Sequence, residues 1–314
     1  PAGFAHPFVY PPPGLLLLAP LALFDYAGAT TALLFASHAS LVAVMLGMSV
    51  AVHGRAWPRT AGAAAVLAVV VVLVASAQAS RASLGIGQVN FVALAGLVWF
   101  WAALLGRASF WAGGLGLVVL GLLKSYFALI GLVLLLPAGR RMLRPVLVVT
   151  TAAIVASLVL LPAGAWADWL GNYLSPMASS DLYLGRYDFL SFENRTLFAA
   201  LANAPGGGLV PPSPAGGAAM AVAVALQGAA LIRHRRAPEA LTVPAMALVV
   251  LVFLLSPYSW VHYLVYCAGA AGMVALVAAR DRAWGLLAVS LAFLLLLLQP
   301  SALPGAEWGR TYAP

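Results

Sequence analysis

Long apolar runs, separated by short polar or basic segments, dominate this chain of 314 residues. A helix that crosses a membrane needs about 20 predominantly apolar residues, and runs close to that length recur from residue 31 onward. The candidate crossings are residues 31–53, 61–79, 89–105, 146–162, 215–232, 240–255, 263–279 and 283–298. The pattern predicts an all-α polytopic membrane protein, with residues 1–314 forming a single integral membrane domain.

Two apolar stretches differ from simple crossings. Residues 14–24 are too short to span a bilayer, so we interpret them as an interfacial helix within an outer segment, residues 1–30. Residues 109–136 are interrupted only by Lys124 and Ser125, which favours a pair of short helices, or a re-entrant pair, bent near Lys124. With this pair the chain is predicted to cross about ten times.

Clusters of arginine predict the orientation, because cytoplasmic loops of membrane proteins are enriched in Lys and Arg. The clusters are Arg55/Arg59, Arg107, Arg140/Arg141/Arg144, Arg233/Arg235/Arg236 and Arg280/Arg282. If Arg107 and Arg140 are both cytoplasmic, the chain between them crosses an even number of times, and Lys124 lies toward the outer side. The resulting plan has helices over 31–162 and 214–298, a long outer loop over 163–213 and an outer tail over 299–314.

Composition excludes several other classes of protein. Hydrophobic residues make up 64% of the chain and charged residues only 8%, which no soluble domain of this size shows. The net charge of +8 arises from the arginine clusters, so it does not indicate nucleic-acid binding. Cys267 is the only cysteine, so no intramolecular disulfide forms. Neither metal-ligand spacing nor a nucleotide or Ser-His-Asp motif is present, so we expect no metal and no cofactor.

The stretch from Leu254 to Tyr263, LLSPYSWVHY, interrupts two apolar runs on the predicted outer side. Pro257 ends a helix because it lacks an N–H group, and His262 exchanges a proton near neutral pH. An interfacial turn with a belt of aromatic rings is the plain alternative. This stretch is therefore one candidate part of a functional site.

Lys124, Gln88 and Asn90 are further candidate site residues. A cation within apolar sequence indicates a functional site because its burial in lipid is costly, and a lysine suits a phosphate; the alternative is a lysine that snorkels to the interface. Gln88 and Asn90 open a predicted crossing, where polar side chains should face protein, water or a ligand. A polar N-cap is the alternative there.

Together these motifs resemble glycosyltransferase family 87, membrane enzymes of the GT-C class that use polyprenyl-phosphate sugars. The resemblance covers nearly all of the chain, in order: Tyr10-Pro11-Pro12, Ala19-Pro20-Leu21-Ala22, Gly87-Gln88-Val89-Asn90, Gly121-Leu122-Leu123-Lys124, Asn194-Arg195-Thr196-Leu197 and Leu255 to Tyr263. It implies a GT-C-like bundle in the cell membrane with its active site on the extracytoplasmic face. It also implies that a mannosyl or arabinosyl unit is transferred, with inversion, to a glycolipid or polysaccharide of the cell envelope. Of the two sugars, mannose is the expected one.

The resemblance also implies roles for particular residues. Lys124 and Arg195 are expected near the phosphate, and His262 is the candidate catalytic residue. The other residues expected to bind substrate are Tyr10, Gln88, Asn90, Asn194, Ser256 and Trp260. GT-C enzymes carry an essential Asp in the first outer loop, before the Tyr-Pro-Pro stretch. Nothing acidic precedes Asp25 and the chain starts at Pro1, so we expect the first helix and the base Asp upstream of Pro1.

Two other classes of function remain open. A secondary transporter of an anionic or lipid-linked substrate would also have broken helices and polar residues within the membrane, but it should show repeat symmetry, which this sequence lacks. A non-catalytic membrane scaffold would not need Lys124 within apolar sequence.

Overall fold

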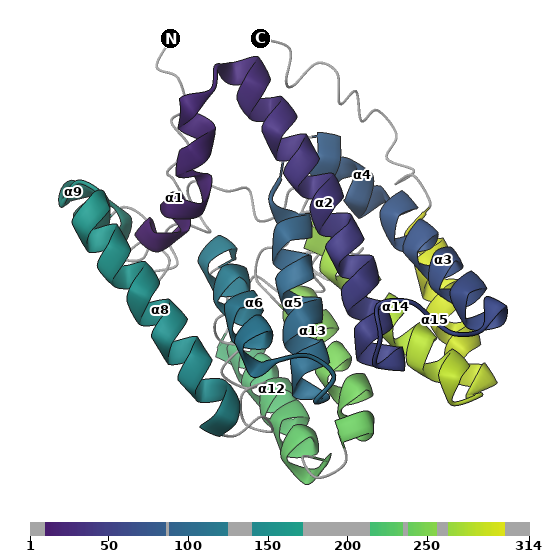
Figure 1. Ribbon diagram of the computed structural model, residues 1–314. Helices are drawn as coiled ribbons and strands as arrows, with labels where there is room; N and C mark the ends of the chain where they lie inside the picture. The colour runs from purple at the N-terminus through teal and green to yellow at the C-terminus, as the bar shows by residue number, and fades with distance from the viewer. Residues whose placement is uncertain are drawn as a thin grey trace, which may run out of the picture.

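The computed structural model describes residues 10–85, 88–124, 140–171, 214–234, 238–255 and 263–298. Within these ranges every regular element is helical (Figure 1). The α-helices are α1 (Pro12–Leu18), α2 (Tyr26–His53), α3 (Ala61–Ser76), α4 (Gln78–Gly85), α5 (Asn90–Leu104), α6 (Phe110–Leu123), α8 (Arg140–Leu160), α9 (Gly164–Trp169), α12 (Pro214–His234), α13 (Thr242–Leu255), α14 (Leu264–Arg280) and α15 (Trp284–Leu296). Two short 3₁₀ helices are η1 (Ala19–Leu23) and η4 (Pro238–Leu241).

Helix limits follow the apolar runs of the sequence closely, so the prediction of an all-α fold is confirmed for the described residues. The start of α2 differs from the prediction: the helix begins at Tyr26, five residues before the predicted position 31. Asp25 caps this helix, because its carboxylate accepts a hydrogen bond of 2.7 Å from the Gly28 N–H. The interfacial helix predicted at 14–24 is a short α-helix followed by η1.

The segment predicted as one crossing over 61–79 is instead bent. Its two parts, α3 and α4, meet at Ala77 with an angle of 56° between them. Ala77 has extended backbone angles, and the Ser80 hydroxyl donates to the Val74 carbonyl at the break. The Ser80 hydroxyl thus satisfies a backbone carbonyl that a continuous helix would have paired.

Two described helices, Tyr26–His53 and Arg141–Leu160, are long and apolar enough to cross a membrane, and the bent α3–α4 pair makes a third if it counts as one span. The predicted total of about ten crossings is not confirmed by these helices and stays a prediction. Several predicted parts lie outside the described residues: the second half of the pair bent at Lys124, most of the 163–213 loop and the 299–314 tail.

Helix α5 forms the centre of the bundle, packed against α2, α6 and α14. Nearly all of its side chains are buried, including Phe91, Phe100 and Trp101. A helix that is apolar on every side belongs in such a buried position.

Glycines allow α5 and α6 to approach closely. A Cβ atom built on Gly116 would lie 2.5 Å from the Gly96 carbonyl oxygen, and one on Gly96 would meet the Gly116 carbonyl oxygen. Small residues at a helix crossing let two backbones touch, which is the usual packing device of membrane helices.

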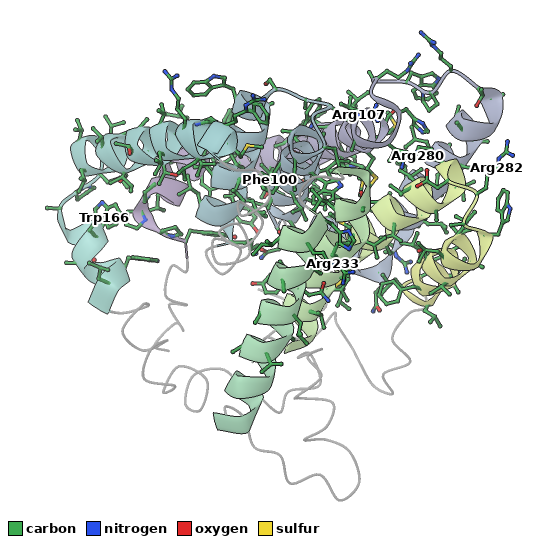
Figure 2. The ribbon with its side chains drawn as sticks, turned by 90° about the horizontal axis from the view of Figure 1, so that it is seen from below. Phe100, Arg107, Trp166, Arg233, Arg280 and Arg282 are labelled. Atoms are coloured by element: carbon green, nitrogen blue, oxygen red, sulfur yellow. The ribbon has the colours of Figure 1, made fainter. Side chains whose placement is uncertain are left out.

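The bundle has two distinct ends. The arginine end is where α2 finishes: Arg280 donates to the Val52 carbonyl over 3.4 Å, and the Arg107 guanidinium lies beside Gly54. Figure 2, seen from this end, labels Arg107, Arg233, Arg280 and Arg282. The start of α8 at Arg140 also points to this end (Figure 1).

The Lys124 end is the opposite one, because Lys124 follows the last residue of α6 whereas Arg107 precedes its first. Helix α13 finishes at the Lys124 end and α14 begins there (Figure 1). Helices α6 and α8 thus start at the same end of the bundle (Figure 1), and the even number of crossings between Arg107 and Arg140 stays a prediction. The side of the membrane that each end faces stays a prediction.

Candidate active site

Lys124 occupies the position where α6 stops. Its backbone N–H still donates to the Leu120 carbonyl over 2.8 Å, but its φ of −144° and ψ of 84° leave the helix. The side chain is only 5% exposed. A buried ammonium requires a compensating partner, because its transfer out of water is costly. Burial within the protein also argues against the alternative in which Lys124 snorkels to the interface.

Two tyrosine rings face the ammonium of Lys124. The Nζ atom lies 4.3 Å from the centroid of the Tyr263 ring and 5.9 Å from that of the Tyr10 ring. Both distances fall within the range of a cation–π interaction, which is strongest when the pair is desolvated. Among the described residues, no carboxylate forms an ion pair with Lys124. The rings stabilise the cation without cancelling its charge.

Tyr10 reaches Lys124 because α1 packs directly on the last turn of α6. A Cβ atom at Gly14 would lie 2.5 Å from the Leu122 carbonyl oxygen, so a glycine is required at this contact. The Gly14 N–H donates to the Pro11 carbonyl over 2.7 Å. The proline at the first helical position suits a helix start because it has no N–H to satisfy. The Tyr-Pro-Pro stretch thereby places the Tyr10 ring beside Lys124.

A buried chain of hydrogen bonds adjoins Tyr263. Three residues further along α14, the Tyr266 hydroxyl donates to Asn90 Oδ1 over 3.1 Å. Asn90 Nδ2 in turn donates to Ser83 Oγ over 2.7 Å. The side chains of Ser83, Asn90 and Tyr266 are all fully buried. This chain ties the starts of α5 and α14 to α4.

The structure describes four of the predicted site residues, Tyr10, Gln88, Asn90 and Lys124. Tyr10 and Lys124 are in contact, and Asn90 belongs to the adjoining chain of hydrogen bonds. Gln88 is half-buried next to it, and its backbone N–H donates to the Ser83 carbonyl over 2.9 Å. The predicted residues that lie outside the described ranges are Asn194, Arg195, Ser256, Trp260 and His262.

The alternative of a polar N-cap at Asn90 is wrong. Val89 holds the N-cap position of α5 and makes no side-chain capping bond, while Asn90 is already the first helical residue. Its amide instead pairs with Ser83 and Tyr266.

Sequence reasoning missed the roles of Tyr263 and Tyr266. Tyr263 ends the candidate stretch that begins at Leu254, but nothing in that stretch indicates its contact with Lys124, and Tyr266 falls within the apolar run 263–279. Their spacing gave a signal, because two phenols three residues apart at a helix start lie on one face. Their partners could not be found in the same way, since Lys124, Asn90 and Ser83 are more than 130 residues away in sequence.

The described residues form an all-helical fold, and the apolar composition is that of a membrane protein. Its candidate site is a buried lysine with two aromatic neighbours at helix ends. A family model for glycosyltransferase family 87 matches residues 8–257, most of the chain, so the chain belongs to glycosyltransferase family 87. No curated protein and no solved structure matches it. The matched segment includes Tyr10, Asn90 and Lys124. Membership of this family implies that the protein is a glycosyltransferase.

Proposed function

We propose that this glycosyltransferase moves a sugar from a polyprenyl-phosphate donor to a glycolipid or polysaccharide of the cell envelope, and that the preferred sugar is mannose. The enzyme crosses the cell membrane several times, and the Lys124 end faces the extracytoplasmic side. The observation that carries the proposal is the buried Lys124 ammonium, held by two aromatic rings with no carboxylate partner among the described residues. Such a cation in apolar surroundings suits the phosphate of a lipid-linked sugar.

The reaction is a displacement at the anomeric carbon. An acceptor hydroxyl forms the new C–O bond while the bond to the phosphate oxygen breaks, which inverts the configuration. The lipid phosphate leaves with the electron pair, and a carboxylate accepts the hydroxyl proton. The Lys124 ammonium stabilises the negative charge that develops on the departing phosphate. Since the donor carries its own leaving group, no nucleotide-binding motif is required.

Three of the remaining predicted residues lie in the segment that joins α13 to α14. His262 immediately precedes Tyr263, whose ring contacts Lys124. Ser256 and Trp260 follow the last residue of α13. We assign His262 to the phosphate or the reacting sugar, with Arg195 on the phosphate. Gln88, Asn194, Ser256 and Trp260 complete the substrate-binding set.

The test is a transfer assay with the whole protein in lipid nanodiscs. Radiolabelled mannose is supplied either on polyprenyl phosphate or on a nucleotide, together with an extract of envelope glycolipids. We expect label in the glycolipid fraction only with the polyprenyl-phosphate donor. Transfer from the nucleotide donor alone would overturn the proposed donor.

The same protein in sealed liposomes tests the transporter alternative. Translocation of a labelled lipid-linked sugar without any transfer would favour a transporter and contradict the proposed enzyme.

A further inference from the structure

Tyr263 is the N-cap of α14 and lies against the candidate phosphate-binding lysine, and Tyr266 on the first turn of α14 lies against a buried asparagine. We propose that both are positioning residues: Tyr263 holds the Lys124 ammonium in place for an anionic phosphate, and Tyr266 holds Tyr263 in place through Asn90 and Ser83. The identity of the ligand as a lipid phosphate rests on the proposed function.

An aromatic partner suits a lysine that must accept an anion. A carboxylate would neutralise the ammonium, and an incoming phosphate would have to displace it. The face of a tyrosine ring attracts the cation through its quadrupole and leaves the net charge unchanged. The ring also restricts a long, flexible side chain before the ligand arrives, which lowers the entropy lost on binding. Tyr263, at 4.3 Å from Nζ, makes the closer of the two ring contacts.

The position of Tyr263 depends in turn on Tyr266. The two residues share one face of α14 because they are three apart. The hydroxyl of Tyr266 is fixed by Asn90 on α5, and Asn90 is fixed by Ser83 on α4. Water cannot replace these bonds easily, because Tyr266, Asn90 and Ser83 are fully buried. The first turn of α14 is thereby held against two helices that do not contribute to the ammonium site.

The first test compares a lipid phosphate with its neutral alcohol, using farnesyl phosphate and farnesol on the detergent-solubilised whole protein. Tyr263→Leu should weaken the binding of farnesyl phosphate at least tenfold and leave that of farnesol unchanged. Tyr263→Phe keeps the ring face and should stay within about twofold of the original protein. Tyr266→Phe should weaken farnesyl phosphate binding by roughly three- to tenfold. The matched control is Tyr26→Leu, because the Tyr26 ring is 90% exposed, and it should change neither affinity.

A merely structural role gives a different pattern. Affinities for farnesyl phosphate and farnesol would then fall together in Tyr263→Leu, and that result would overturn the proposal. In a Lys124→Met background, Tyr263→Leu should have no further effect on farnesyl phosphate, since the ring then has no cation to hold. Additive losses in that double variant would equally overturn it.

Isosteric replacements at position 263 remove the question of folding. Phenylalanine with one, two or three fluorine atoms keeps the shape of the ring but weakens its quadrupole stepwise. Affinity for farnesyl phosphate should fall stepwise as the number of fluorine atoms rises. An unchanged affinity across the series would contradict the positioning of Lys124 by the Tyr263 ring.

Failure of this inference is distinguishable from failure of the proposed function. If farnesyl phosphate binds through Tyr263 and Lys124 while no sugar is transferred, the positioning role stands and the enzyme proposal fails. If Tyr263→Leu transfers sugar from a polyprenyl phosphate at the original rate, the enzyme proposal stands and the positioning role fails.

Discussion

Lys124 is the only lysine in the chain, and its charge rather than its bulk defines the candidate site. Lys124→Ala should lower sugar transfer at least about tenfold, equivalent to about 1.4 kcal/mol of transition-state stabilisation. Lys124→Arg should retain part of the activity, because the charge survives although the geometry differs. The readout is the initial rate of transfer from polyprenyl-phosphate mannose, normalised to the amount of folded protein. Unchanged turnover in a well-expressed Lys124→Ala protein would remove Lys124 from the site.

Asn90 differs from Lys124 in that it stabilises the fold: both ends of its amide are hydrogen-bonded inside the protein. Asn90→Leu removes the hydrogen bonds of Asn90 with the buried hydroxyls of Ser83 and Tyr266, at a cost of about 0.5–1.5 kcal/mol for each bond lost. We therefore expect a clear drop in the thermal unfolding temperature in detergent. The double variant Asn90→Leu/Tyr266→Phe should lose less than the sum of the two single variants, because both substitutions remove the same bond between Asn90 and Tyr266. Full additivity would show that the bond between Asn90 and Tyr266 contributes little.

At the residue scale, sequence reasoning found the cation but not its surroundings. Lys124 was recognisable because a charge within apolar sequence is costly wherever it lies. Tyr10 came from the family resemblance. The Tyr266 contact depends on how α14 packs against α5, and the Tyr263 contact depends on where α14 starts relative to Lys124. Local sequence carries no direct signal for either.

At the scale of helices, the crossing of α5 and α6 depends on Gly96 and Gly116. Gly96→Ala introduces a methyl group against the Gly116 carbonyl, and overpacking of this kind costs about 1–3 kcal/mol. The helices should separate, which is measurable as a lower unfolding temperature. Gly285→Ala is the matched control, because a Cβ atom at this helical glycine meets nothing within 4 Å. That variant should be neutral or slightly more stable, since alanine favours a helix. Equal losses in both variants would contradict the close contact.

Helices were the most predictable feature of the chain, because an apolar run both drives membrane burial and favours a helix. The exception is the α3–α4 bend, where residues 61–79 looked like one run. At this bend the Ser80 hydroxyl satisfies the Val74 carbonyl locally. Short polar side chains near the end of an apolar run can therefore mark a bend as well as a helix end.

For the whole molecule, the separation of the Lys124 end from the arginine end makes the orientation testable. Cys267 is the only native cysteine and is buried, so labelling of the original protein should be low and an introduced thiol can be detected above it. Gly164, at the start of α9, is exposed near the Lys124 end (Figure 1). Ala56, beside Arg55 at the arginine end, is also exposed.

A membrane-impermeant maleimide should label Gly164→Cys in intact cells, and Ala56→Cys only after the membrane is permeabilised. The arginine end should face the cytoplasm because positively charged loops are retained there, and the lipid-phosphate site then opens to the opposite side. Both variants should label fully in detergent, which controls for a thiol hidden by the protein itself. Labelling of Gly164→Cys only after permeabilisation would reverse the orientation and place the Lys124 site on the cytoplasmic side. An extracytoplasmic acceptor could not reach it there.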